Sequence, residues 1–153
     1  MIQIVVDSTG AVPKEYLAQH RNVHVIPLLI SIEGEYIPEN EATIRQVIDY
    51  SEQTKKTVPT SQPSTGDFLK VFESIGKDDP IIVICLTSGV SGTYNGAVLA
   101  ARQSGRKNIA VINSRTTAVG MMEVVEDAVE FIDQGMDFES VSQALLESVN
   151  RMK

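Results

Sequence analysis

The sequence has few of the residues that metal binding and redox chemistry usually require. It contains one cysteine, two histidines and no tryptophan among its 153 residues. A single cysteine excludes a disulfide within the chain, and Cys85 lies in an apolar run, so we expect it to be a buried thiol. Two histidines leave few ligands for a metal ion. The composition therefore predicts a protein without a metal or another cofactor.

Long apolar segments and basic residues are also scarce. No apolar run approaches membrane-spanning length, and no cationic segment precedes the first apolar residues, which argues against a signal peptide. The net charge of −7 disfavours nucleic-acid binding by phosphate neutralisation. We therefore expect a cytoplasmic protein without a membrane span and without a nucleic-acid partner, of the size of one domain.

Strand-like and helix-like stretches alternate along the chain. Apolar runs rich in β-branched residues predict four buried strands: residues 2–6, 23–32, 81–86 and 109–112. Apolar residues at helical spacing predict helices from Ser64, over 94–103, over 119–134 and from Asp137. Pro13 suits the first turn of a short helix that runs to about Gln19. This alternation is typical of an α/β fold. We expect a three-layer α/β/α domain with a mostly parallel sheet of about four strands.

Residues 23–41 are harder to assign. Pro27 cannot donate a hydrogen bond to a strand ladder, so a bend or an edge is expected there. An acidic loop should follow the second strand. Thr43 and Gln46 match a capping box, which predicts that a helix begins at Thr43.

Polar turns directly follow three of the predicted strands. These turns are 7–9, 87–93 and 113–117, rich in serine, threonine and glycine. Ligands of parallel α/β sheets bind beyond the carboxyl ends of the strands, so the three turns should meet at one edge. Thr60, Ser61 and Gln62 form a fourth polar stretch between two prolines, which could lie over the same edge. Hydroxyls and free backbone N–H groups at a helix start are suited to an anion.

Ser91 has several interpretations. It could cap the following helix, because serine is a favoured N-cap. Residues 89–93 also resemble the nucleophile elbow of serine hydrolases, but Thr93 stands where the second glycine should be. Both histidines precede the serine, against the order of a hydrolase triad. A helix cap that can also hold an incoming carboxylate fits the segment better than an esterase.

The remaining polar positions have structural explanations too. Asp7 lacks a second nearby acid for magnesium, and its turn can satisfy its own backbone groups. Arg115 could reach an anion, but an exposed arginine is more often simply solvated. Further candidates for the pocket wall are Ser8, Thr9, Gln62, Ser88, Ser114 and Arg115.

Four motifs stand out along the chain: Asp7-Ser8-Thr9, Thr60-Ser61-Gln62-Pro63, Ser88-Gly89-Val90-Ser91-Gly92-Thr93-Tyr94, and Asn113-Ser114-Arg115 followed by Gly120. Together they resemble the DegV family of bacterial fatty-acid-binding proteins. They follow one another in the family's order along residues 1–153. Members of the family are two-domain proteins, so residues 1–153 are expected to be the N-terminal α/β domain, with the second domain absent.

The resemblance implies that the protein binds a long-chain fatty acid and is not itself an enzyme. Thr60 and Ser91 would hold the carboxylate, with Ser61 and the backbone near Gly92 assisting, and the acyl chain would lie in an apolar tunnel. A separate catalytic subunit of fatty acid kinase would phosphorylate the presented carboxylate. The alternative is an interaction or structural module with an incomplete tunnel, which would cover its apolar surface as a homo-oligomer.

Overall fold

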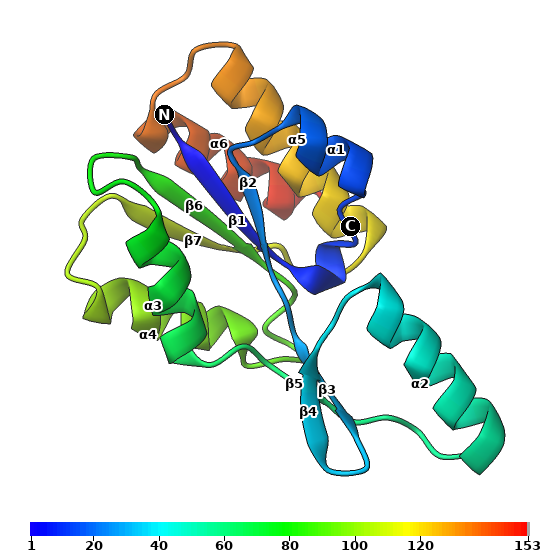
Figure 1. The fold of residues 1–153 in the computed structure, drawn as a ribbon. Coiled ribbons are helices and arrows are strands. Elements are labelled where there is room, and N and C mark those ends of the chain that lie inside the picture. Colours follow the sequence, from blue (N-terminus) through cyan, green and yellow to red (C-terminus); the bar gives the residue numbers. More distant parts are fainter. Residues whose placement is uncertain (153) are drawn as a thin grey trace.

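A computed structural model describes residues 1–152 of the chain, except the side chains of residues 41 and 42. Its centre is a parallel sheet with the strand order β2-β1-β6-β7 (Figure 1). The strands are β1 (Gln3–Asp7), β2 (Val23–Ile26), β6 (Ile81–Cys85) and β7 (Ile109–Asn113). The four-stranded parallel sheet predicted from the sequence is confirmed.

Helices cover both faces of this sheet (Figure 1). One layer consists of α1 (Lys14–Gln19), α5 (Val119–Asp133) and α6 (Phe138–Arg151), and the other of α3 (Thr65–Ser74) and α4 (Thr93–Gln103). A short 3₁₀ helix, η1 (Ser8–Gly10), follows β1. The three-layer α/β/α architecture is therefore confirmed.

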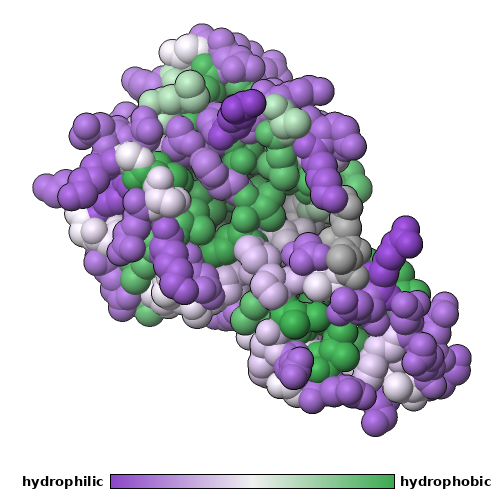
Figure 2. All heavy atoms as spheres, viewed as in Figure 1, coloured by the Kyte–Doolittle hydropathy of each residue, from purple (hydrophilic) through white to green (hydrophobic). Residues whose placement is uncertain are grey.

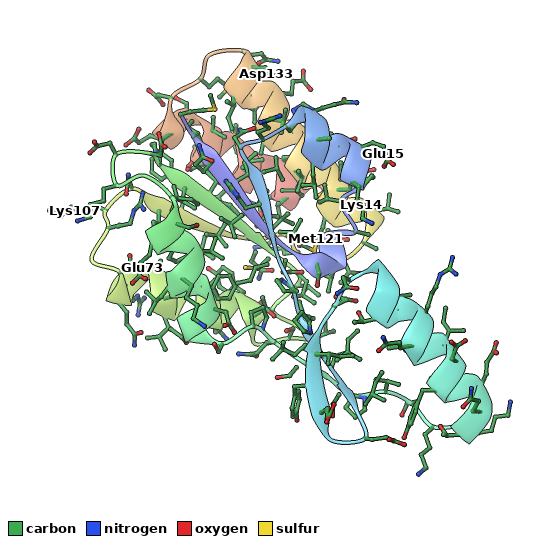
Figure 3. All side chains as sticks on the ribbon, in the orientation of Figure 1. Lys14, Glu15, Glu73, Lys107, Met121 and Asp133 are labelled. Atoms are coloured by element: carbon green, nitrogen blue, oxygen red, sulfur yellow. The ribbon has the colours of Figure 1, made fainter. Side chains whose placement is uncertain are left out.

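The central strands are apolar on both sides because both sides are covered. All five residues of β6 are buried, and alternate residues face different layers. Ile82 and Ile84 pack with α5 and α6, whereas Val83 and Cys85 pack with α3 and α4. Cys85 is fully buried, as expected, and burial raises the pKa of its thiol. Figure 3 shows Met121 beside η1, while Glu73, Lys107 and Asp133 lie on the outside.

The largest correction concerns residues 23–38. The single predicted strand over 23–32 is two strands in two sheets, because the chain leaves the parallel sheet at Pro27. The predicted acidic loop contains a further strand that returns as a hairpin. The second sheet is antiparallel, in the order β4-β3-β5, and consists of β3 (Leu29–Ile32), β4 (Glu35–Pro38) and β5 (Thr60–Ser61).

Residues 28–62 form a lobe that projects from the three-layer body (Figure 1). It contains the antiparallel sheet and α2 (Glu41–Thr54). The prediction that this helix begins at Thr43 is wrong by two residues. Asn40 accepts a hydrogen bond from the Thr43 N–H at 3.1 Å, and the Thr43 hydroxyl accepts one from the Asn40 N–H at 2.7 Å. The reciprocal cap is therefore centred on Asn40, three residues before the predicted one.

Two other predicted caps are confirmed. Ser64 and Asp67 form a reciprocal capping box at the start of α3. Asp137 accepts a hydrogen bond from the Ser140 N–H at 2.8 Å at the start of α6. The pKa of Asp67 is held below its usual range mainly by the hydrogen bond from the Ser64 hydroxyl and further by the Ser64 N–H. The pKa of Asp137 is lowered mainly by the hydrogen bond from the Ser140 N–H. Both helices therefore begin where the sequence predicts.

Candidate functional site

The polar turns meet at the carboxyl edge of the parallel sheet, as the strand order requires. Hydrogen bonds join each turn to the next. The Leu86 N–H donates to Asp7 Oδ2 at 2.7 Å, and the Ser88 hydroxyl accepts from Asn113 Nδ2 at 2.7 Å. The Ala118 N–H donates to the Thr9 carbonyl at 2.9 Å. The turns after β1, β6 and β7 therefore form one connected surface.

Asp7 organises the first of these turns from inside the protein. It is 1% exposed and accepts hydrogen bonds from the Thr9 N–H at 3.1 Å, from the Thr9 hydroxyl and from Leu86. Desolvation by burial raises the pKa of Asp7, although the hydrogen bonds from Thr9 and Leu86 act in the opposite direction. The carboxylate satisfies backbone groups of its own turn and of the next one.

Ser8 connects the body to the lobe. Its hydroxyl accepts a hydrogen bond from the Leu28 N–H at 2.9 Å and donates one to Glu39. The Glu39 N–H in turn donates to the Leu28 carbonyl at 2.8 Å. Thr9 is held by Asp7 and lies within 3.1 Å of the Met121 sulfur. Both predicted pocket residues therefore help to assemble the edge of the sheet.

Ser91 and Gly92 lie at the start of α4. The N-cap position is occupied by Gly92 and not by Ser91, but Ser91 Oγ accepts a hydrogen bond from the Thr93 N–H at 3.2 Å. The Ser91 and Thr93 hydroxyls are 2.9 Å apart. Ser91 thus caps the helix from one position outside it, and its hydroxyl remains partly exposed.

Thr60 and Ser61 belong to an edge strand, which the sequence predicted as a loop. β5 pairs with β3, so that Leu29 faces Ser61 and Ile30 faces Thr60. Thr60 is exposed and Ser61 is half-buried. The following residue, Gln62, reaches the start of α4, because a Cβ built on Gly92 would lie 2.1 Å from Gln62 Oε1. The structure therefore brings the polar stretch at 60–62 beside the Ser91 loop.

The remaining predicted site residues differ in how accessible they are. Ser88 is exposed and bonds to Asn113. Ser114 is fully buried, and its hydroxyl bonds to Thr116 within the same turn. Arg115 is exposed, with a left-handed φ of 57°. Of these three residues, Ser88 and Arg115 are open to solvent, whereas Ser114 is buried and stabilises its own turn.

The two histidines have partners away from Ser91. His24 Nε2 lies 2.8 Å from Gln3 Oε1, and burial lowers the pKa of its imidazole. The His20 ring lies against the Tyr16 ring, with 4.2 Å between their centroids. Neither ring is placed to activate the Ser91 hydroxyl, whose partner is Thr93. This geometry offers no support for a serine-hydrolase triad.

An apolar groove lies next to the polar edge, and its apolar lining residues were not identified from the sequence, where the family resemblance implied only an apolar tunnel. Its cavity volume is about 630 Å³, and it separates the body from the lobe. Its apolar lining includes Val12, Pro13, Leu17, Val25 and Ile44. On the face seen in Figure 2, apolar residues are exposed on both the body and the lobe. The sequence did not identify these residues because the periodicity of apolar residues places Val25 and Ile44 in a core. In the structure they are 37% and 46% exposed.

The groove and the polar turns are connected through residues 116–118. The Thr116 carbonyl accepts a hydrogen bond from the Thr87 N–H at 3.0 Å, while Thr117 and Ala118 line the groove. Ser8 and Thr9 line it as well. The polar turns after β1 and β7 therefore border the apolar groove directly, and the turn after β6 is joined to them through Thr87. That combination is suited to a ligand with an anionic head and an apolar tail.

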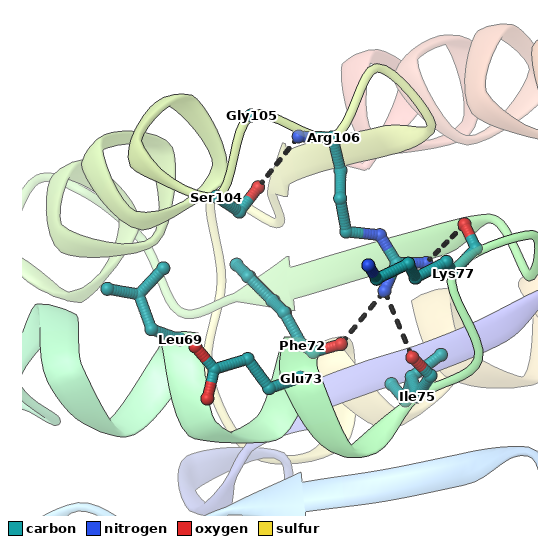
Figure 4. A pocket seen from close by; sticks show the side chains of 8 residues that line it. All are labelled: Leu69, Phe72, Glu73, Ile75, Lys77, Ser104, Gly105 and Arg106. Carbon is teal, nitrogen blue, oxygen red and sulfur yellow. Dashed lines mark hydrogen bonds between the residues drawn. The ribbon is translucent and has the colours of Figure 1, made fainter.

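A second cavity, of about 370 Å³, lies between the C-terminal ends of α3 and α4 (Figure 4). Two cationic residues line it, Lys77 and Arg106, and the Arg106 guanidinium binds backbone carbonyls. Nη1 donates to the carbonyls of Phe72 at 2.8 Å and Ile75 at 3.1 Å, and Nη2 donates to those of Gly76 at 2.9 Å and Asp79 at 2.6 Å. We assign Arg106 a structural role, because these carbonyls end α3 and lead into β6.

Replacing Arg106 by alanine should lower the free energy of unfolding by about 3 kcal/mol, because several carbonyls lose a charged donor. Arg106→Lys should recover little, since an ammonium cannot reach the carbonyls that the guanidinium fork spans. Urea denaturation measures both effects. Arg102→Ala, on the exposed face of the last turn of α4, is the matched control. Equal stability of Arg106→Ala and this control would contradict the structural role.

Two further features, a metal site and a membrane-spanning helix, are absent from the described part of the chain. No group of three or more histidine, cysteine, aspartate or glutamate side chains there could hold a metal ion. No helix within residues 1–152 is long and apolar enough to cross a membrane.

The fold and the site define a class of protein, namely a three-layer α/β protein in which a polar edge suited to an anion lies beside an apolar groove. The chain belongs to the DegV family, whose family model matches residues 1–153.

Curated relatives support this assignment. A DegV domain-containing protein of Staphylococcus aureus is 39% identical over 144 residues, covering 93% of this chain and 50% of the relative. A DegV domain-containing 15.5 kDa protein of the same species is 41% identical over 131 residues, covering 84% of this chain and 91% of the relative. Protein DegV of Bacillus subtilis is 29% identical over 154 residues. The chain spans about half the length of most of the curated relatives it matches.

Solved structures show the same fold. A DegV family protein from Thermus thermophilus, described as binding fatty acid, has a TM-score of 0.87 at 26% identity, covering 98% of this chain and 53% of that one. DegV from Bacillus subtilis, described as a fatty acid binding protein, has a TM-score of 0.84 at 29% identity, covering 97% and 54%. The likeness again extends over about half of each relative.

Proposed function

We propose that the protein binds a long-chain fatty acid at the carboxyl edge of the parallel sheet. The observation that carries the proposal is the joint presence of a polar edge and an apolar groove in a family whose solved members are described as fatty-acid-binding proteins. The carboxylate would be held by the hydroxyls of Thr60, Ser61 and Ser91 and by the backbone N–H groups around Gly92. Hydroxyls and the start of α4 favour a negative charge.

The acyl chain would enter the groove between the body and the lobe. A volume of about 630 Å³ falls within the usual range of small-molecule sites. Removing the acyl chain from water supplies most of the binding free energy, and the polar edge fixes the orientation of the ligand.

The bound carboxylate would be presented to a partner kinase that uses ATP to form an acyl phosphate. The chain itself would do no chemistry, in keeping with the partners already made by Ser91 and the two histidines. The expected result is acyl phosphate only when fatty acid, ATP and the kinase subunit are all present. Acyl phosphate formed by the chain and ATP alone would contradict this division of labour.

Native mass spectrometry of the purified chain tests fatty-acid binding directly, because it reports the bound mass and the stoichiometry together. We expect one fatty acid per chain, and denaturing extraction should release it. After delipidation, added stearic acid should rebind, whereas the fatty alcohol of the same length should bind much more weakly, because it lacks the charge. Lipid-free protein that ignores added stearic acid would overturn the proposal. Such protein in oligomeric form would favour the interaction module, whose apolar surface is covered by self-association.

A further inference from the structure

Gln62 connects the two groups of hydroxyls that the proposed function assigns to the ligand. Thr60 and Ser61 lie on the lobe, whereas Ser91 lies on the body. The carboxamide of Gln62 extends from the first group to the second. A Cβ built on Gly92 would lie 2.1 Å from Gln62 Oε1, 3.1 Å from Cδ and 3.3 Å from Nε2.

The carboxamide also reaches the next turn of α4. A Cβ built on Gly96 would lie 3.6 Å from Gln62 Nε2 and 3.9 Å from the Pro63 carbonyl. Residues four apart lie on one face of a helix, so Gln62 rests on a strip that the two glycines leave bare. Pro63 is buried directly after it, and Pro59 precedes the strand. Gln62 is exposed, but the two prolines restrict the backbone around it, so we expect a displacement of its side chain to be passed on to Ser61 and Thr60.

Gly92 is needed here for its lack of a side chain and not for its backbone conformation. Its φ of −79° and ψ of 1° are open to any residue. A methyl group at this position would displace the end of Gln62, which is a flexible side chain, rather than a rigid part of the backbone. Alanine at position 92 should therefore fold normally and still move Gln62.

We propose that Gln62 is a positioning residue that sets the spacing between Thr60 and Ser61 on the lobe and Ser91 on the body, by packing on the bare surface of Gly92. The effect of this spacing on ligand binding rests on the proposed function, whereas the contact between Gln62 and Gly92 does not. In the described residues the carboxamide has packing partners and no hydrogen bond, so the contact acts through shape.

The first test needs no ligand, so its outcome is independent of the proposed function. Backbone amide resonances of Thr60 and Ser61 are recorded for the wild type and for Gly92→Ala. We expect the substitution to shift both resonances, and to shift them much less when Gln62 is already alanine, because the intermediary is then missing. Gly89→Ala is the matched control, since a Cβ there meets only ordinary contact, 3.5 Å from Thr87 Oγ1. Equal shifts with and without Gln62 would overturn the inference.

The second test measures the dissociation constant for stearic acid. Gln62→Ala and Gly92→Ala should each weaken binding about 10-fold, and the double variant should be no weaker than either single one. Gln62→Met, which keeps the length of the side chain, should stay within about 3-fold of the wild type. Thermal denaturation should change little in all three single variants. Additive losses, or a Met variant as weak as the Ala variant, would contradict positioning by shape. A wild type that binds no stearic acid would instead contradict the proposed function.

Discussion

The variant in which both Thr60 and Ser91 are replaced by alanine should bind stearic acid about 100-fold more weakly than the wild type, or worse. Each hydroxyl can donate one hydrogen bond to a carboxylate, and hydrogen bonds to charged groups contribute about 1.5–3 kcal/mol each. The two residues lie on different parts of the molecule, the lobe and the body, so each single variant should retain partial binding. Titration calorimetry with delipidated protein measures the loss.

The control removes two hydroxyls elsewhere. Ser74 and Ser142 each donate to a carbonyl of their own helix, at 2.7 Å in both cases. Ser74→Ala with Ser142→Ala should leave the dissociation constant unchanged. A Thr60 and Ser91 double variant that binds as well as this control would show that the hydroxyls do not hold the ligand.

Replacing Asp7 by alanine should lower the free energy of unfolding by about 3 kcal/mol. The carboxylate accepts hydrogen bonds from the backbone N–H groups of Thr9 and Leu86, and Leu86 is only 5% exposed. A buried donor without an acceptor costs about 1–3 kcal/mol. Asp7→Asn keeps one acceptor oxygen and should lose about half as much. Urea denaturation at neutral pH measures both variants, and an alanine variant as stable as the wild type would refute the role of Asp7.

The pH dependence of this effect has a definite sign. Burial raises the pKa of Asp7 above its ordinary value of 3.8, so the folded state binds the proton more tightly than the unfolded state. The stabilisation from protonation is fully present below that value and is lost as the pH rises through the raised pKa. The wild type should therefore gain stability relative to Asp7→Asn as the pH falls from about 7 to about 4. A constant difference across this range would contradict the shift.

The sequence was sufficient to predict the parallel sheet and the polar edge at which its turns meet. β6 consists of five apolar residues because helices cover both of its faces, and that pattern can be read without a structure. Strand order then brings the turns after Asp7, Cys85 and Asn113 together. Local caps such as Ser64 were predictable for the same reason, since the partner is three residues away in the sequence.

The lobe was harder to predict because its strands follow no clear pattern. β4 is mostly exposed, so alternation between apolar and polar residues does not mark it, and β5 has only two residues. Both strands exist through their pairing with β3, which is a long-range effect. The apparent capping box at Thr43 was misleading because Asn40, which had no predicted role, competes for the same N–H group.

The contact between Gln62 and Gly92 could not be predicted from the sequence for a similar reason. Both residues stand out in the sequence, one between prolines and one in a glycine-rich turn. Their proximity depends on α3 and α4 packing side by side, which no local pattern encodes. The apolar groove depends likewise on how far the lobe stands from the body.

The pairing of Leu29 with Ser61 gives the lobe the character of an insertion. The chain leaves the body just before Leu29 and returns just after Ser61, so its two crossing points are neighbours. Segments of this kind can be exchanged between proteins without disturbing the host fold, because the host chain needs only a short splice to close the gap. The body carries Ser91, whereas the exchangeable segment carries Thr60, Ser61 and one wall of the groove. Exchanging the insertion between homologues while the body stays constant would therefore replace Thr60, Ser61 and one wall of the groove together and leave Ser91 in place.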